Sequence, residues 1–183
     1  MNHRIKSSCG ARLLCRAIAT SLGLLVLTLA GAASATVDLS LGAGGGVVGG
    51  SVHGEAFVAD AGVGVPVAEK VEIGGRGFLI VGGIGEDMSA VTGDGRYDLP
   101  RPWEWLRPSL NGGVGWYRVE NCPLLFGKCE DHDGVGFNLG GGLDVPVYRE
   151  LVTVGVDARW HHAFVPGGID AGTALLNLGL HLD

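Results

Sequence analysis

The sequence lacks, beyond residue 35, the long apolar runs, the basic patches and the many cysteines that would each mark a class of protein. No segment there approaches 18 unbroken apolar residues, so a membrane-spanning helix is excluded from this part of the chain. All 19 acidic residues lie after residue 35, whereas four of the 13 basic residues precede it. This acidic balance argues against nucleic acid as a partner, and against docking on an anionic surface by charge.

The first 35 residues have the three regions of a secretory signal peptide. Residues 17–30 are apolar, and Ala33-Ser34-Ala35 matches a cleavage site. The start of the segment is positively charged through Arg4, Lys6, Arg12 and Arg16. We therefore expect residues 1–35 to be a signal peptide and residues 36–183 to form one domain. A membrane anchor is the alternative, but the apolar run is short for a spanning helix and small residues follow it.

Only two cysteines, Cys122 and Cys129, remain once the signal peptide is removed. An even pair in an exported chain predicts a disulfide. A zinc site is the alternative, with His132 and the neighbouring acids as further ligands, but zinc would want more ligands than the two thiols supply. We expect the disulfide and no metal site.

Residues 134–164 show the clearest pattern in the chain. Side chains of a strand point alternately to opposite faces, so alternation of apolar and polar residues predicts a strand with two different faces. One face of the second half is apolar: Val152, Val154, Val156, Ala158, Trp160, His162 and Phe164. The opposite face carries Thr153, Gly155, Asp157, Arg159 and His161. A second alternating stretch precedes it across a tight link, which predicts an antiparallel pair of strands longer than a soluble sheet usually has.

The same alternation predicts eight strands. Their expected ranges are 37–48, 55–67, 71–85, 88–99, 109–119, 134–147, 152–164 and 173–182. Alternation is lost in the third range after Gly77, and Gly93-Asp94-Gly95 would interrupt the fourth. Long strands with alternating faces are typical of outer-membrane barrels, and a closed sheet is the only sheet that leaves no unpaired edge in a bilayer.

Glycine and aromatic residues support the barrel. Most of the 34 glycines lie after residue 35, many at positions that alternation turns inward. An eight-stranded barrel is just wide enough to be filled by side chains, so inward glycines would make room for larger neighbours. The aromatic residues divide between the outer strand ends (Phe57, Trp116, Phe137, Trp160 and Phe164) and the inner turns (Trp103, Trp105 and Tyr148), as the two aromatic girdles of a membrane barrel would.

Three segments, RPSLNGGVGWYRV, GVGFNLGGGLDVPV and LVTVGVDARWHHAF, together with a final strand rich in Leu and Gly, resemble the small outer-membrane β-barrel proteins. They are similar to the transmembrane half of outer-membrane protein A. The resemblance implies an eight-stranded barrel with short periplasmic turns and outward loops. It implies a structural or adhesive protein or a very narrow pore, with outer-membrane lipid and the barrel-insertion machinery as partners. The sequence itself identifies no surface partner. Chains of this type usually end in an aromatic residue, whereas this one ends Leu182-Asp183.

Two motifs that could indicate an enzyme are weak. Residues 44–49 fit G-x-G-x-x-G, but a glycine-rich strand follows them where a dinucleotide site needs a helix. His161 and His162 are adjacent on a strand and so point to opposite faces. A serine two residues after either His could share its face, but Ala163 and Phe164 hold those positions. We therefore expect no catalytic residues and no cofactor.

Charged residues at inward positions are the remaining candidates. Asp60, Arg76 and Asp157 should lie at similar depth in the lumen, with Arg159 slightly higher. Buried charges must be paired, and an arginine can hold two carboxylates. The group is then either a gate that plugs the lumen or a satisfied polar core. Counting inward acids gives Asp38, Asp60, Glu72, Asp144 and Asp157 against those two arginines. Some of these acids should therefore meet water, a proton or a cation.

The sequence thus predicts an all-β, eight-stranded antiparallel up-and-down transmembrane barrel. We expect a non-enzymatic outer-membrane protein acting in envelope structure or surface contact, with a narrow pore as a further option. The alternative is a soluble secreted barrel that binds a small lipid or another apolar ligand, with its apolar face inward.

Overall fold

The computed structural model describes residues 36–49, 53–82, 86–121, 130–148 and 151–182. They form a closed barrel in which each strand pairs antiparallel with its neighbours in sequence and β1 pairs with β8. The strands are β1 Val37–Gly49, β2 His53–Ala68, β3 Val71–Gly82, β4 Glu86–Asp98, β5 Arg107–Asn121, β6 Glu130–Tyr148, β7 Val152–Ala163 and β8 Ile169–Leu182. The expected all-β, eight-stranded, up-and-down barrel is confirmed. Among the described residues, no helix is long and apolar enough to cross a membrane.

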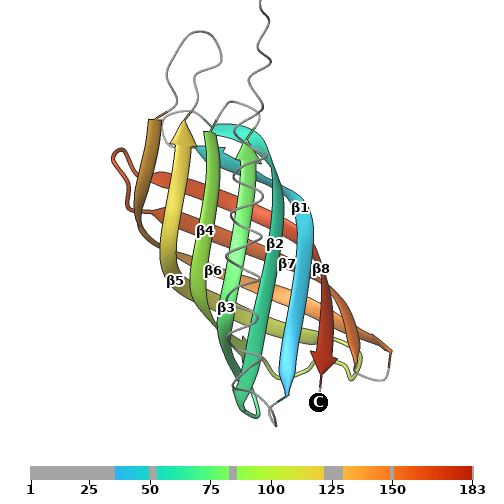
Figure 1. Cartoon of the computed structure of the whole chain (residues 1–183). Coiled ribbons are helices and arrows are strands. Elements are labelled where there is room, and N and C mark those ends of the chain that lie inside the picture. The colour runs from blue at the N-terminus through green and yellow to red at the C-terminus, as the bar shows by residue number, and fades with distance from the viewer. Residues whose placement is uncertain (1–35, 50–52, 83–85, 122–129, 149–150, 183) are drawn as a thin grey trace, which may run out of the picture.

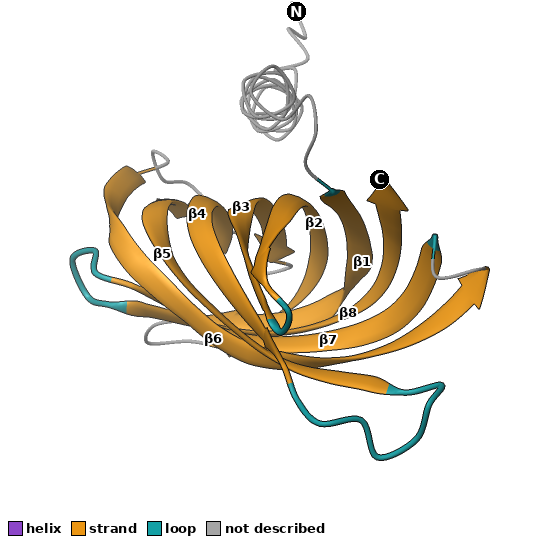
Figure 2. Ribbon diagram, turned by 90° about the horizontal axis from the view of Figure 1, so that it is seen from below, coloured by secondary structure: helices purple, strands orange, loops and turns teal. Residues whose placement is uncertain are grey.

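The strands are steeply tilted and curve around one lumen (Figures 1 and 2). We call the end at which β1 begins and β8 finishes the terminal end, and the opposite end the distal end. The register of β2 on β3 and of β6 on β7 shifts at Pro66 and Pro146, both close to the terminal end. A proline cannot donate to the ladder, and these positions beside a link tolerate the missing bond. The predicted signal peptide and both cysteines lie outside the described residues.

The two faces of the barrel wall differ as the alternation predicts. In β7, Gly155, Asp157, Arg159 and His161 are buried, while the residues between them are exposed. Large apolar side chains cover the outer wall; Val114 and Leu176 are 70% and 68% exposed. Exposed aromatic residues lie towards both ends: Phe57, Trp116, Trp160 and Phe164 on the distal half, and Tyr97, Trp103, Trp105 and Tyr148 at the terminal end.

The structure differs from the sequence-based expectation in β3 and β4. β3 keeps its alternation to Gly82, because Phe78 and Ile80 point into the lumen and are 2% and 1% exposed. The lumen is therefore apolar in its distal half, although polar residues line it elsewhere. β4 runs through Gly93-Asp94-Gly95 without a break, with Asp94 inward between two outward glycines.

The distal ends of β5 and β6 also extend further than expected. The acidic run from Glu130 to Asp133, expected in a loop, belongs to β6 and pairs with β5. Arg118 on β5 contacts Asp131 on β6 at 2.5 Å, outside the lumen. Residues 122–129, which separate β5 from β6 in the sequence, lie outside the described residues.

Inward glycines lie beneath large side chains of neighbouring strands. A Cβ added to Gly140 would overlap Arg159, which is its direct partner across the β6–β7 pair. A Cβ on Gly136 would overlap the ring of Tyr117, and one on Gly64 would overlap the carboxylate of Glu72. These close approaches allow a narrow barrel to hold long side chains in its interior.

Candidate functional site: a charged lumen

The middle of the lumen holds a continuous chain of ion pairs. Arg159 contacts Asp157 through Nε and Asp94 through Nη1, both at 2.6 Å. Arg76 contacts Asp60 through Nη1 at 2.5 Å and approaches Asp94 through Nε at 3.5 Å. Asp94 therefore joins the two arginines. We refer to these five residues, Asp60, Arg76, Asp94, Asp157 and Arg159, as the mid-lumen network.

Neutral polar side chains complete the mid-lumen network. Asn111 donates to Asp157 at 2.5 Å, and Thr92 donates to Asp94 at 2.6 Å. Asn138, which is fully buried, accepts from Arg159 and donates to Asp94, each at 3.2 Å. Ionised groups out of water are tolerated only when their remaining hydrogen-bonding positions are also filled, and these neighbours fill many of them.

The structure places the four predicted lumen charges, Asp60, Arg76, Asp157 and Arg159, in one network. Their partners could not be assigned from the sequence. Arg76 binds Asp60 and approaches Asp94, whereas Arg159 binds Asp157. Sequence reasoning missed Asp94 because its flanking glycines suggested a strand break. Alternation from Met88 onward was the signal that could have found it, since Asp94 has the parity of the buried residues Ala90 and Thr92.

The distal half of the lumen is packed with apolar and aromatic groups. His161 is fully buried, and its ring meets Phe78 edge-on with centroids 4.7 Å apart. Its Nδ1 lies 3.4 Å from the Tyr117 hydroxyl, and its Nε2 lies 3.4 Å from the Thr173 hydroxyl. The Arg159 guanidinium lies 5.5 Å from the Phe78 ring centroid and so joins this layer to the mid-lumen network. We call this packed layer the distal plug; its other members include Val48, Val58, Ile80, Met88, Ala90 and Val119.

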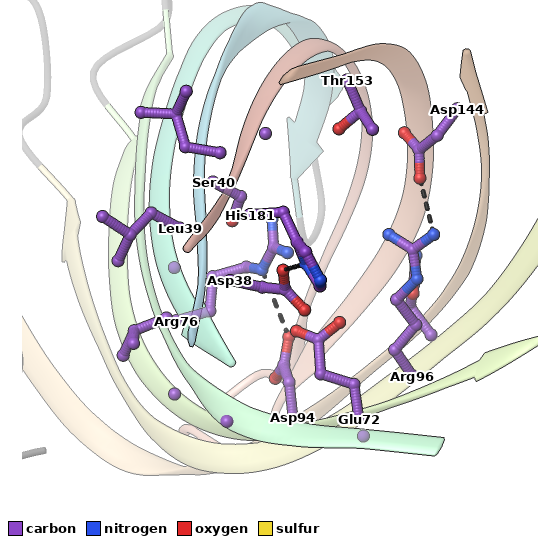
Figure 3. A pocket seen from close by; sticks show the side chains of 18 of the residues that line it. Asp38, Leu39, Ser40, Glu72, Arg76, Asp94, Arg96, Asp144, Thr153 and His181 are labelled. Carbon is purple, nitrogen blue, oxygen red and sulfur yellow. Dashed lines mark hydrogen bonds and ion pairs between the residues drawn. The ribbon is translucent and has the colours of Figure 1, made fainter. Parts of the chain in front are cut away.

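The terminal end of the lumen contains a cavity of about 160 Å³ (Figure 3). On one side Arg96 binds Asp144 at 2.7 Å and Asp98 at 2.9 Å. On the other side Asp38 pairs with His181. Glu72 also lines the cavity and lies over Gly64. Arg96, Asp98, Asp38 and His181 are more exposed than the mid-lumen network, so the terminal end is an open vestibule of mixed charge.

The structure also shows where the two adjacent histidines and the glycine motif of the sequence lie. His161 lies in the lumen, whereas His162 lies outside and contacts Asp170 at 2.9 Å. Residues 44–49 belong to β1, which pairs with β2 and β8. In the described ranges, no group of three or more His, Cys, Asp or Glu side chains is placed to hold a metal ion.

The sequence matches no protein-family model and no curated protein, whereas solved structures do match the fold. Neisserial surface protein A is 12% identical, with a TM-score of 0.65 over 79% of this chain and 95% of that one.

Two further solved barrels are similar. The N-terminal β-barrel domain of Pseudomonas aeruginosa OprF is 16% identical, with a TM-score of 0.56 over 80% of this chain and 97% of that one. Ail, the attachment invasion locus protein of Yersinia pestis, is 15% identical, with a TM-score of 0.55 over 81% of this chain and 99% of that one. At these identities the likeness establishes the fold alone. The predicted resemblance is thus confirmed at that level: the chain has the fold of the small eight-stranded outer-membrane barrels.

Proposed function

We propose that this chain is a non-enzymatic outer-membrane β-barrel protein that acts in envelope structure or surface contact. The outer wall is the observation that carries the proposal. It exposes Leu41, Val114, Val156 and Leu176 around the barrel, where water would be an unfavourable neighbour. A bilayer removes that cost, and the exposed aromatic residues towards both ends fit its two interfaces.

The alternative, a soluble barrel that binds a lipid, requires the opposite arrangement. Such a barrel keeps an apolar cavity inside and polar side chains outside. Here the terminal half of the lumen is charged, and the distal plug fills the apolar half with its own side chains. The arrangement therefore favours the membrane barrel.

Export and insertion are part of the proposal. Residues 1–35 would direct the chain across the inner membrane, and the barrel-insertion machinery would assemble residues 36–183 in the outer membrane of a Gram-negative envelope. The structural neighbours include a surface protein and an attachment protein by name, which supports a role in surface contact. The loop between β5 and β6, closed by a Cys122–Cys129 disulfide, would lie outside the cell.

A narrow pore is the second candidate, and the vestibule favours it. Water and ions can enter the lumen from the terminal end as far as the mid-lumen network. Beyond that network, the packed side chains of Phe78, Tyr117 and His161 in the distal plug close the lumen. The wild-type barrel would therefore conduct poorly, and any opening would require the side chains of both the mid-lumen network and the distal plug to separate.

Cell fractionation combined with electrophoresis tests the main proposal. The chain should sediment with outer membranes, and it should migrate differently before and after boiling, because a membrane barrel resists detergent until heated. A soluble protein in the periplasm or culture medium, with one mobility before and after boiling, would contradict the proposal. Deleting residues 2–35 should leave the chain in the cytoplasm, which tests the export step separately.

A further inference from the structure

Among the buried side-chain oxygen atoms that have no hydrogen-bond partner in the described residues, two lie in the lumen on β2 and β8, the strands on either side of β1: Oδ1 of Asp60 and Oδ1 of Asn177. The Asp60 side chain is fully buried. Its Oδ2 accepts from Arg76, so only one of its two oxygens is paired. A carboxylate oxygen out of water without a donor is costly, and it indicates a missing neighbour.

The two oxygens converge on one place. Gly42 on β1 pairs directly with Asp60 on β2 and with Asn177 on β8. A Cβ added to Gly42 would overlap both Oδ1 atoms, so they approach each other above this glycine. The register of three adjacent strands thus brings two acceptors together, and neither has a donor among the described residues.

The balance of charges in the lumen also indicates that a positive group is missing. The mid-lumen network contains three carboxylates, Asp60, Asp94 and Asp157, and only two guanidinium groups. The terminal-end groups do not correct the deficit, because their acids also outnumber their arginines: Asp38, Glu72, Asp98 and Asp144 against Arg96 and Arg107, with His181 paired to Asp38. The buried network therefore has room for one more positive charge.

We propose that the lumen binds one monovalent metal cation between Asp60 and Asn177, with their Oδ1 atoms as ligands. Carboxylate and amide oxygens are the ligands that hard cations such as Na⁺ prefer. A divalent ion would want more carboxylates, and no three acidic side chains among the described residues are placed to bind one ion together. Flipping the Asn177 amide, so that its nitrogen and oxygen exchange places, would give Asp60 a hydrogen-bond donor but would leave the network short of one positive charge.

The test measures the thermal stability of the barrel, purified in detergent, in sodium chloride against choline chloride at equal ionic strength. Choline is a bulky organic cation and should not replace a small metal ion between two oxygen ligands. The unfolding temperature of wild type should rise with the logarithm of sodium concentration, because an ion that binds only the folded state stabilises it. The corresponding rise in the free energy of unfolding should fit the binding of about one ion per barrel. The slope should vanish in Asp60→Asn, which removes the charge, and in Gly42→Ala, which pushes the two oxygens apart.

Asp144→Asn is the matched control, because it removes a lumen carboxylate from the vestibule and should keep the sodium dependence. An equal slope in wild type and Asp60→Asn would overturn the proposal. So would a wild type that is insensitive to sodium but loses stability as pH rises, which would assign the missing charge to a proton. If Asp60→Asn does not fold, sodium-23 NMR of wild type decides: a broadened sodium signal that excess potassium sharpens supports the site, and an unbroadened signal excludes it. None of these readouts depends on where the barrel resides in the cell.

Discussion

Val156→Arg tests the face assignment of the barrel most directly. Val156 lies near the middle of β7, is 48% exposed on the outer wall, and pairs with Leu143 on β6 and Leu176 on β8. If this wall faces hydrocarbon, an arginine here lies near the bilayer midplane and should lower the free energy of unfolding by about 2–4 kcal/mol.

A second arginine variant on the same strand, at a different depth in the bilayer, provides a comparison for Val156→Arg. Val154 is two residues closer to the terminal end of the same strand, about 7 Å along a tilted path. Val154→Arg should therefore cost less, about 1–2 kcal/mol, because the penalty falls towards the interface. Val156→Ala shortens the side chain without adding charge and should cost under about 1 kcal/mol, since lipid replaces the lost contacts.

Urea unfolding of the barrel in lipid vesicles, followed by fluorescence of its four tryptophans, provides the measurement. The dependence on urea concentration must stay the same among variants for the comparison to hold. A Val156→Arg barrel as stable as Val156→Ala would refute the reasoning, because it would mean that the outer wall is in contact with water. Equal losses for the two arginine variants would contradict the depth assignment.

The remaining predictions concern the charges and the distal loop. Arg159→Met should lower stability by about 3–5 kcal/mol, because it removes the guanidinium bound to Asp157 and Asp94 while both carboxylates stay buried. Arg118→Met breaks an exposed ion pair and should cost about 0–1 kcal/mol. Urea unfolding compares the two variants, and similar losses would argue against a buried network. In planar bilayers the wild-type barrel should conduct poorly, and Arg76→Ala should leave it poorly conducting, because this substitution loosens the mid-lumen network but keeps the distal plug in place; a wide, steady wild-type conductance would exclude the plugged lumen. Cys122 and Cys129 should be joined by a disulfide worth roughly 2–3 kcal/mol; mass spectrometry of the unreduced, exported protein that finds two free thiols would disprove it.

Strand number and face assignment could be predicted because alternation is a local property. In β7, every other residue from Thr153 to His161 is polar or small, and each of these lies inside. The same rule fails to interpret Phe78 and Ile80 on β3, whose outward neighbours are also apolar. Alternation cannot assign faces when both are apolar, and the distal plug is such a region.

Partners within the lumen could not be predicted because they depend on register, which no single strand encodes. Asp94 on β4 contacts Arg159 on β7, three strands away around the barrel, and also approaches Arg76 on β3. The contact between Asp94 and Arg159 crosses the lumen and depends on the stagger of every intervening pair of strands. A sequence can show that the charges point inward, but only the closed barrel determines which of them meet.

The glycines beneath large lumen side chains have a consequence for how the strands find that stagger. A slip of two residues between neighbouring strands keeps every side chain on its own face, so the pattern of apolar and polar faces cannot penalise it. The sizes and charges of the lumen side chains can penalise such a slip. Slipping β6 on β7 in one direction would replace Gly140 by Asn138 opposite Arg159, and two large side chains would compete for one space. The opposite slip would place Asp144 directly across from Asp157, where two carboxylates repel each other.

The order of large and small lumen residues therefore specifies register, in addition to the order of faces. It follows that substitutions at such positions should be tolerated in pairs: a larger residue in place of Gly64 requires a smaller one in place of Glu72 on the adjacent strand. The interior of this barrel would then vary among related sequences by exchange of bulk between neighbouring strands, at nearly constant total volume.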